Sequence, residues 1–199
     1  MINNYRGVED TELYSRVVNR IRQFFLERNF VEVHTQDRLS ILAACEDPST
    51  VASFDYAGET WPLPQTGQMW LEYELLTKPA LPGVFCVSTS FRNEPNPIPG
   101  RHKILFPMFE FECKGTIDDL RALEEDLLVY LGLGEKSSFF HKTYDELAEL
   151  YKVKELSNVE ENQMKLDFGN VLFLEKFPQY TSPFWNMKKA GDYAHKIDV

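Results

Sequence analysis

Residues 91–112 constrain the fold of this chain more than any other segment. They read FRNEPNPIPGRHKILFPMFEFE, in which three closely spaced prolines separate two runs rich in aromatic residues. Proline fixes φ and cannot donate a backbone hydrogen bond, so the prolines predict a loop. The flanking runs predict an outgoing strand over 83–94 and a return strand over 104–113, paired as an antiparallel hairpin.

The two faces of this hairpin differ in chemistry, because side chains alternate between faces along a strand. One face of the return strand is apolar and is expected to lie in the core; it comprises Leu105, Phe109, Phe111 and Cys113. The other face comprises Phe106, Met108, Glu110 and Glu112. Arg92 and Glu94 share one face of the outgoing strand. The sequence therefore predicts an open polar platform with an aromatic ring on it.

This platform has the chemistry of a nucleotide site beside an amine. A guanidinium suits a phosphate, an aromatic ring suits a purine, and a carboxylate suits an ammonium group. Arg101 and His102 lie on the loop above it and add positive charge. The alternative is a surface hairpin whose charges only face water.

The rest of the chain predicts an α+β domain in which an antiparallel sheet is flanked by helices on one side. Apolar spacing and capping residues predict helices over 11–28, 68–77, 117–131 and 143–151. Further strands are predicted over 30–35, 53–56, 60–63, 171–174 and 196–199. With 199 residues and no repeat or low-complexity segment, the chain is expected to form a single domain over 1–199.

Charge and composition exclude several functions. The net charge is −10, and no basic stripe is visible, so extensive contact with tRNA or DNA is not expected. Arg92, Arg101, His102 and Lys103 instead predict a local site for a small anion. No apolar run approaches the roughly 18 residues of a membrane span, and the N-terminus lacks a signal-peptide core, which predicts the cytoplasm. The three cysteines match no disulfide or zinc spacing, so reduced buried thiols are expected, and no residue is predicted as a metal ligand.

Residues 91–112 resemble the second class-defining motif of the class II aminoacyl-tRNA synthetases. The helix and strand over 11–37 resemble the first motif. Among the subgroups, that for Asp, Asn and Lys is the most similar. Further segments resemble its amino-acid pocket and later core, namely 44–46, 63–71, 143–144, 172–178 and 182–187. The resemblance covers nearly the whole chain and implies the class II synthetase fold.

The resemblance implies a role for each polar residue around ATP. Arg92 would hold the α-phosphate, and Phe106 would stack on adenine. Arg101 and His102 would reach the outer phosphates. Glu94 would lie near the adenine or the acceptor end.

On the amino-acid side, the resemblance implies that Glu46, Gln68 and Glu110 cradle the ammonium group. The reaction would be attack of the amino acid's carboxylate on the α-phosphate of ATP, with Mg²⁺ as cofactor, giving an aminoacyl-adenylate and pyrophosphate. It needs no protein nucleophile, because positioning and charge stabilisation do the catalysis. The family also implies a homodimer.

Three positions depart from the family pattern. Gln36 stands where the first motif has a proline that helps form the dimer interface. Leu105 stands where a Glu precedes the stacking Phe. Leu71 stands where the aspartyl type has a Lys that reads the substrate carboxylate, so aspartate is not supported as the substrate.

Two modules of the family have no counterpart in this sequence. No segment resembles the Gly-rich third motif with its phosphate-binding Arg, and no oligonucleotide-binding barrel precedes the catalytic pattern, so anticodon recognition is not expected. Three hypotheses remain. The first is an adenylate-forming ligase whose acceptor is tRNA, ammonia or a protein side chain. The second is a non-catalytic paralogue or fragment that binds a nucleotide, an amino acid or a protein. The third is amidation of the kind catalysed by asparagine synthetases.

Overall fold

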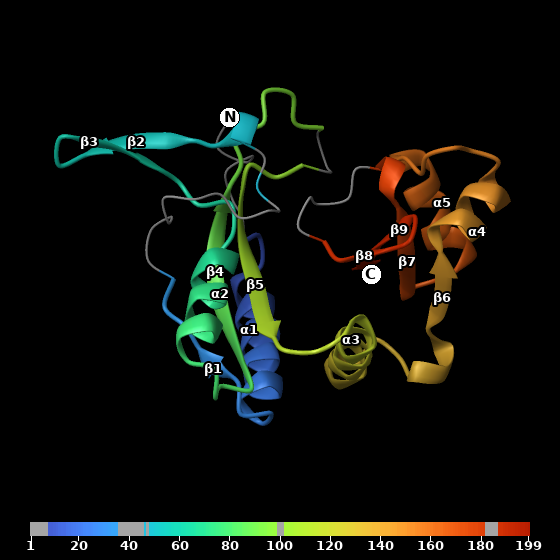
Figure 1. Ribbon diagram of the computed structural model, residues 1–199, viewed down its shortest axis with the longest axis horizontal. Coiled ribbons are helices and arrows are strands. Elements are labelled where there is room, and N and C mark those ends of the chain that lie inside the picture. The colour runs from blue at the N-terminus through green and yellow to red at the C-terminus, as the bar shows by residue number, and fades with distance from the viewer. Residues whose placement is uncertain (1–7, 36–45, 47, 99–101, 182–186) are drawn as a thin grey trace. The chain divides into compact units, whose positions relative to one another are not determined.

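The structure is a computed structural model that describes residues 8–35, 46, 48–98, 102–181 and 187–199. The chain divides into two compact units, Met1–Lys114 and Gly115–Val199, and each is described by itself (Figure 1). The expectation of a single domain stays a prediction.

The first unit begins with helix α1, Thr11–Leu26. Asp10 caps its N-terminus, because its Oδ1 accepts a hydrogen bond of 2.8 Å from the backbone N–H of Leu13. Just beyond its end, Asn29 adopts a positive φ of 61°, a conformation that asparagine tolerates better than most residues. The predicted helix and the predicted stop at Asn29 are therefore confirmed.

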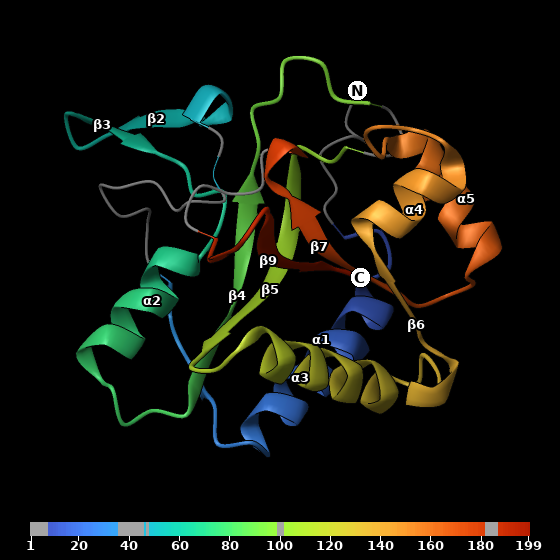
Figure 2. The same ribbon diagram turned by 45° about the vertical axis from the view of Figure 1, so that its right-hand side comes forward.

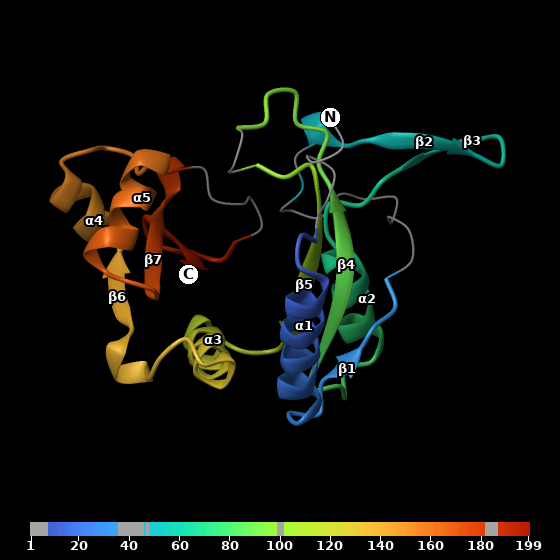
Figure 3. The same cartoon turned by 180° about the vertical axis from the view of Figure 1, so that it is seen from behind.

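A three-stranded sheet forms the centre of this unit. Strand β1 (Val31–Glu32) runs parallel to β4 (Gly83–Phe91), and β4 pairs in antiparallel register with β5 (Leu105–Cys113). Helix α1 and helix α2 (Gln68–Thr77) cover opposite faces of the β4–β5 pair, as the views from the front and from behind show (Figures 1 and 3). The expectation of helices on one side only is therefore wrong for this unit, because α2 also packs on the second face, where Leu71 is buried against Val84 and Cys86.

Phe25 is the centre of the core between α1 and the sheet. It is fully buried, and its ring centroid lies 4.7–5.7 Å from those of five other aromatic rings. These rings belong to Phe24, Phe30, Phe85, Phe109 and Phe111. The apolar face predicted for the return strand is thus a core face.

A two-stranded hairpin extends from the first unit (Figure 2). It consists of β2 (Ser53–Tyr56) and β3 (Glu59–Pro62), as predicted to within one residue. Ala57 and Gly58 form its turn with φ of 54° and 83°. Two consecutive positive φ values give a turn whose twist matches that of the strands it joins.

The second unit contains three helices and a four-stranded sheet among its described residues. The helices are α3 (Ile117–Leu131), α4 (Tyr144–Tyr151) and α5 (Asn158–Asp167). The strands are β6 (Phe140–Thr143), β7 (Leu172–Pro178), β8 (Lys189–Ala190) and β9 (Tyr193–Asp198), in the order β6-β7-β9-β8. Single-turn 3₁₀ helices lie at Pro48–Thr50 in the first unit and at Lys136–Ser138 and Gln179–Thr181 in the second.

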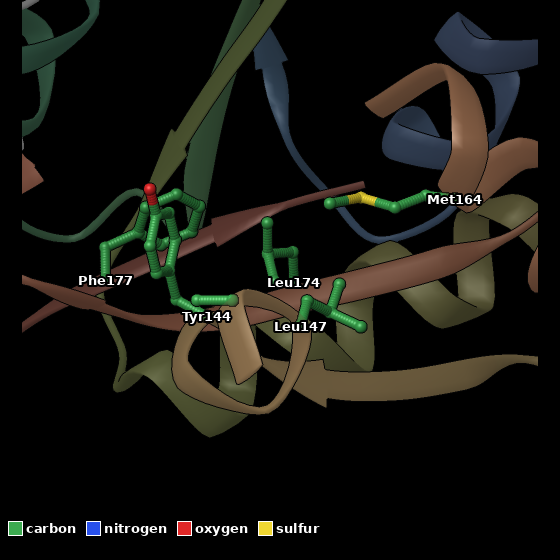
Figure 4. Close-up of a cluster of buried hydrophobic side chains, with 6 residues drawn as sticks. Tyr144, Leu147, Met164, Leu174 and Phe177 are labelled. Carbon is green, nitrogen blue, oxygen red and sulfur yellow. The ribbon is translucent and has the colours of Figure 1, made fainter. Parts of the chain in front are cut away.

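The pairing of β7 with β9 is irregular beside the core of this second unit. The register shifts between Glu175 and Phe177, where Lys176 has a positive φ of 56°. Glu175 pairs with Ile197 and Phe177 with Ala194, so the extra residue lies in β9, where His195 and Lys196 stand opposite Lys176. Leu174 and Phe177 pack in one buried cluster with side chains of α4 and α5 (Figure 4); the cluster comprises Tyr144, Leu147, Ala148, Met164, Leu174 and Phe177.

Several local predictions differ from the structure. Strand β4 ends at Phe91, three residues before the predicted end, because the loop prolines stop its pairing. The sequence reading missed α5 and β6. Cys86 is buried, Cys113 is half-buried, and Cys45 lies outside the described residues. None of the described helices has the length and apolar character needed to cross a membrane.

We expect Phe25→Ala to destabilise the first unit by about 3–5 kcal/mol, because it removes a fully buried ring and leaves a cavity. Urea unfolding followed by circular dichroism measures the effect. Leu76→Ala is the control, since Leu76 is 81% exposed and should change stability by less than about 0.5 kcal/mol. Equal effects of the two substitutions would contradict this account of the core.

Candidate active site

The polar face of the β4–β5 pair carries the candidate site. The register places Ser90 opposite Phe106, Ser88 opposite Met108 and Cys86 opposite Glu110. Residues directly opposite each other share a face of the sheet. Phe106, Met108, Glu110 and Glu112 therefore lie together as predicted. The platform is less open than expected, because α2 packs on it and buries Leu71 against Val84 and Cys86.

Arg92 and Phe106 lie side by side at one end of this face. The guanidinium carbon of Arg92 is 5.6 Å from the centroid of the Phe106 ring, and its Nε donates to Ser90 Oγ at 3.4 Å. The backbone N–H of Arg92 donates to the Ile104 carbonyl at 2.8 Å, which extends the hairpin by one rung. A cation and a flat ring thus stand next to each other, a pair that suits a phosphate and a purine.

The loop between the two strands brings Glu94 and His102 together. Nδ1 of His102 lies 2.6 Å from Oε2 of Glu94. Because β4 ends at Phe91, the prediction that Glu94 shares a strand face with Arg92 is wrong. The pairing of His102 with a carboxylate was not predicted either. Arg101 lies outside the described residues, so its proposed phosphate contact stays a prediction.

Glu110 connects the sheet to the start of α2. Its Oε2 accepts hydrogen bonds from the Gly67 backbone N–H at 2.7 Å and from Ser88 Oγ at 2.6 Å. Its Oε1 accepts from the Thr66 hydroxyl. A carboxylate has about four acceptor positions. Oε2 also accepts from the Cys86 thiol at 3.9 Å, so four donors already surround this carboxylate, and its role toward an ammonium group stays a prediction.

Sequence reasoning missed the donors to Glu110. They lie beside a cavity of about 700 Å³ whose lining includes Thr66, Gly67, Ser88, Thr35 and Trp70. This volume is in the range of small-molecule sites. The signal that could have found them is the run of small and hydroxyl residues just before α2, together with the serines on the polar face of β4.

Glu46 and Gln68 occupy different places beside this network. Glu46 is buried, and its Oε1 accepts from the backbone N–H of Gln65 at 3.4 Å. The side chain of Gln65 in turn donates to Thr50 Oγ1 at 2.9 Å. Gln68 begins α2, and its side-chain amide donates to the carboxylate of Glu112. The structure thus brings Gln68 close to β5 and connects Glu46 to the segment before α2.

Glu112 has an unusual protonation equilibrium. Burial raises the pKa of its carboxyl from 4.5 to about 7, and the nearby negative charges of Glu72 and Glu110 act in the same direction. The hydrogen bond from Gln68 opposes this rise in pKa. Near neutral pH, Glu112 therefore exists in both protonation states.

The fold and this face define a class of protein. Residues 6–198 match the family model for tRNA synthetases class II (D, K and N). The chain belongs to this family.

Curated relatives and solved structures are also similar to this chain. The chain is 35% identical over 115 residues to the cytoplasmic asparagine–tRNA ligase of Mus musculus, a match that covers 57% of this chain and 20% of the relative. Asparaginyl-tRNA synthetase from Pyrococcus horikoshii, complexed with asparaginyl-adenylate, has the same fold with a TM-score of 0.78. That match is 20% identical and covers 92% of this chain and 48% of that chain. Asparaginyl-tRNA synthetase from Entamoeba histolytica, in complex with asparaginyl-adenylate, matches with a TM-score of 0.76 at 20% identity. That match covers 94% of this chain and 48% of that chain.

The chain thus spans about a fifth of the mouse relative and about half of the two solved structures. The homodimer implied by the family stays a prediction, because Gln36 lies outside the described residues.

We expect Glu112→Gln to stabilise the first unit at pH 8 and to have little effect at pH 4.5. A carboxyl with a raised folded-state pKa contributes stability at low pH, and this stability is lost as pH rises from 4.5 to about 7. Glutamine has no charge to bury, so the gain at pH 8 should be about 2–3 kcal/mol. Urea unfolding at the two pH values measures it.

The control for this prediction is Glu12→Gln on α1, because the Glu12 side chain is 90% exposed. Its effect should stay below about 0.5 kcal/mol at both pH values. A gain from Glu112→Gln that is the same at both pH values would contradict the assigned pKa.

Proposed function

We propose that this chain binds ATP and an amino acid and joins them as an aminoacyl-adenylate, with release of pyrophosphate. The observation that carries the proposal is the pair formed by Arg92 and Phe106, which stand 5.6 Å apart on the face that also holds Glu110. The guanidinium supplies charge for a phosphate, the ring supplies a surface for adenine, and the carboxylate supplies acceptors for an ammonium group.

In this reaction a carboxylate oxygen of the amino acid attacks the α-phosphorus of ATP. A new oxygen–phosphorus bond forms, and the bond to the β-phosphate oxygen breaks as pyrophosphate leaves. Arg92 would stabilise the charge on the α-phosphate, and Phe106 would hold the adenine in place. Catalysis is then positioning plus electrostatic stabilisation, with no covalent bond to the protein.

The resemblance predicts Mg²⁺ together with ATP. Within the described residues, no group of three or more His, Cys, Asp or Glu side chains could hold a metal ion. We therefore assign no residue to Mg²⁺ and derive no step through it.

We further propose asparagine as the amino acid. The mouse relative is named an asparagine–tRNA ligase, and two solved structures of the same fold are described with asparaginyl-adenylate. In this chain Leu71 occupies the position where the aspartyl type has a lysine, and its side chain is fully buried against Val84 and Cys86. A buried aliphatic side chain there supports an uncharged amino acid rather than aspartate. The name of the mouse relative also supports the cytoplasmic location predicted from the sequence.

Thermal unfolding with non-hydrolysable aminoacyl-adenylate analogues tests the proposal. A ligand at about 100 times its dissociation constant adds about 2.7 kcal/mol, which raises the midpoint by roughly 5–11 °C for a chain of this size. We expect this rise with the asparaginyl analogue and not with the aspartyl one. Arg92→Ala should remove most of the rise.

Arg16→Ala is the matched control, because it removes an arginine from the exposed side of α1. It should leave the shift unchanged. A flat response from well-folded wild-type protein would overturn the adenylate site. A shift without exchange of pyrophosphate into ATP would instead support a non-catalytic binding module.

A further inference from the structure

The β2–β3 hairpin has one aromatic face. Its register places Phe54 opposite Trp61, and Tyr56 lies two residues beyond Phe54 on the same strand. Residues at these positions share a face of a two-stranded ribbon. The hydrogen bond of 2.7 Å from the Thr60 hydroxyl to Asp55 belongs to the other face, because those two residues oppose each other one step along the ladder.

The three rings of this face are not part of a core. Phe54, Tyr56 and Trp61 are 41%, 68% and 38% exposed, and every residue of the two strands except Pro62 is exposed. The hairpin extends away from the sheet of its own unit (Figure 2). A two-stranded hairpin without further packing is only marginally stable in water. A contiguous set of exposed aromatic side chains on such a ribbon marks an interaction surface.

The charge around this face is negative. Glu59 lies opposite Tyr56 and therefore on the aromatic face. Residues 46–77, which include the hairpin, contain six Asp or Glu and no Lys, Arg or His, in a chain of net charge −10. A nucleic acid, or a second copy of the same hairpin, therefore meets charge of its own sign here.

A positively charged side chain is attracted to this face in two ways. The face of an aromatic ring attracts a cation, and the Glu59 carboxylate attracts it by charge. The chain makes such contacts elsewhere: the guanidinium carbon of Arg28 lies 3.5 Å from the Phe24 centroid, and Nζ of Lys196 lies 4.0 Å from that of Phe177. Among the described residues, no Lys or Arg lies over a ring of the hairpin.

The spacing of the rings indicates the form of the partner. The ring centroids of Phe54 and Tyr56 lie 6.4 Å apart. In an extended chain, side chains two residues apart point the same way and are separated by about 6.5–7 Å. Trp61 lies beside Phe54 across the ribbon and donates its indole N–H to the Tyr56 carbonyl at 3.2 Å, so it offers a partner its ring rather than a polar hydrogen.

We propose that this face binds an extended segment of a partner protein in which Arg or Lys recurs at every second position. Two of its cations stack on Phe54 and Tyr56, and Glu59 supplies the opposite charge. Arg suits the face better than Lys, because a planar guanidinium stacks on a ring. No residue of the hairpin belongs to the site proposed for ATP and the amino acid, so the two proposals are independent.

Fluorescence anisotropy tests the proposal with the full chain and a labelled peptide of about ten residues that alternates Arg and Gly. We expect binding at about 50 mM salt that weakens as the salt concentration rises. Tyr56→Leu should weaken it by about three- to thirty-fold, as for the loss of one cation–π contact. Tyr56→Phe keeps the ring and should stay within about two-fold of wild type.

Two controls separate the aromatic face from general attraction to an acidic protein. Tyr73→Leu removes a tyrosine that is 51% exposed on α2, outside the hairpin, and should change the affinity by less than about two-fold. A peptide with citrulline in place of arginine keeps the shape without the charge and should bind at least about ten-fold more weakly. If Tyr56→Leu disrupts the hairpin, Glu59→Lys replaces it; this variant keeps all three rings and should weaken binding by about two- to ten-fold.

Several results would contradict the proposal. These are no binding of the arginine peptide to wild-type protein, equal binding of the citrulline peptide, or equal effects of Tyr56→Leu and Tyr73→Leu. Sedimentation velocity addresses the remaining occupants. A dimer of the wild type that Tyr56→Leu dissociates would assign the face to a second copy of the chain, and binding of single-stranded RNA that Tyr56→Leu abolishes would assign it to nucleic acid.

Discussion

The carboxylate of Glu110 joins three separate segments of the first unit. It accepts from Ser88 on β4, from the Thr66 hydroxyl and from the Gly67 backbone N–H at the start of α2. Loss of such an acceptor leaves partly buried donors without a partner, at a cost of about 1–3 kcal/mol. The segments also pack closely, since a Cβ at Gly67 would lie 2.8 Å from Cys86 Sγ. The position of α2, and with it the placement of Gln68, depends on this contact.

Much of the first unit could be predicted because its signals are local. Three of these signals each act within a few residues: the alternation along β5, the three loop prolines and the helical spacing of α1. They predict the polar face of the hairpin and the core face that carries Phe109 and Phe111. The juxtaposition of Arg92 and Phe106 also follows from strand period and pairing. The position of a site residue could therefore be predicted where it follows from regular strand geometry.

The remaining features depend on tertiary contacts that no local pattern encodes. Glu94 and His102 meet across a loop, so strand alternation gave the wrong neighbour for Glu94. Lys176 adopts a positive φ opposite the extra residue of β9, and no glycine or proline marks either position. Likewise, the hydrogen bond between Gln68 and Glu112 joins residues that are far apart in the chain. Patterns of charge and polarity identified the residue types in this site but could not assign their partners.

Pro107 has a consequence for how β5 can meet another strand. The hydrogen bond from Arg92 N–H to Ile104 makes those two residues a bonded pair, so Thr89 and Pro107, an odd number of steps further along, form a non-bonded pair. The backbone nitrogen at 107 therefore faces the outer side of β5, which is unpaired among the described strands. Proline carries no hydrogen there, so any strand added to this edge meets a gap in the ladder near the beginning of β5. The edge is thus a poor template for unlimited sheet growth between copies of the chain, and it tolerates only a partner whose own pairing skips this position.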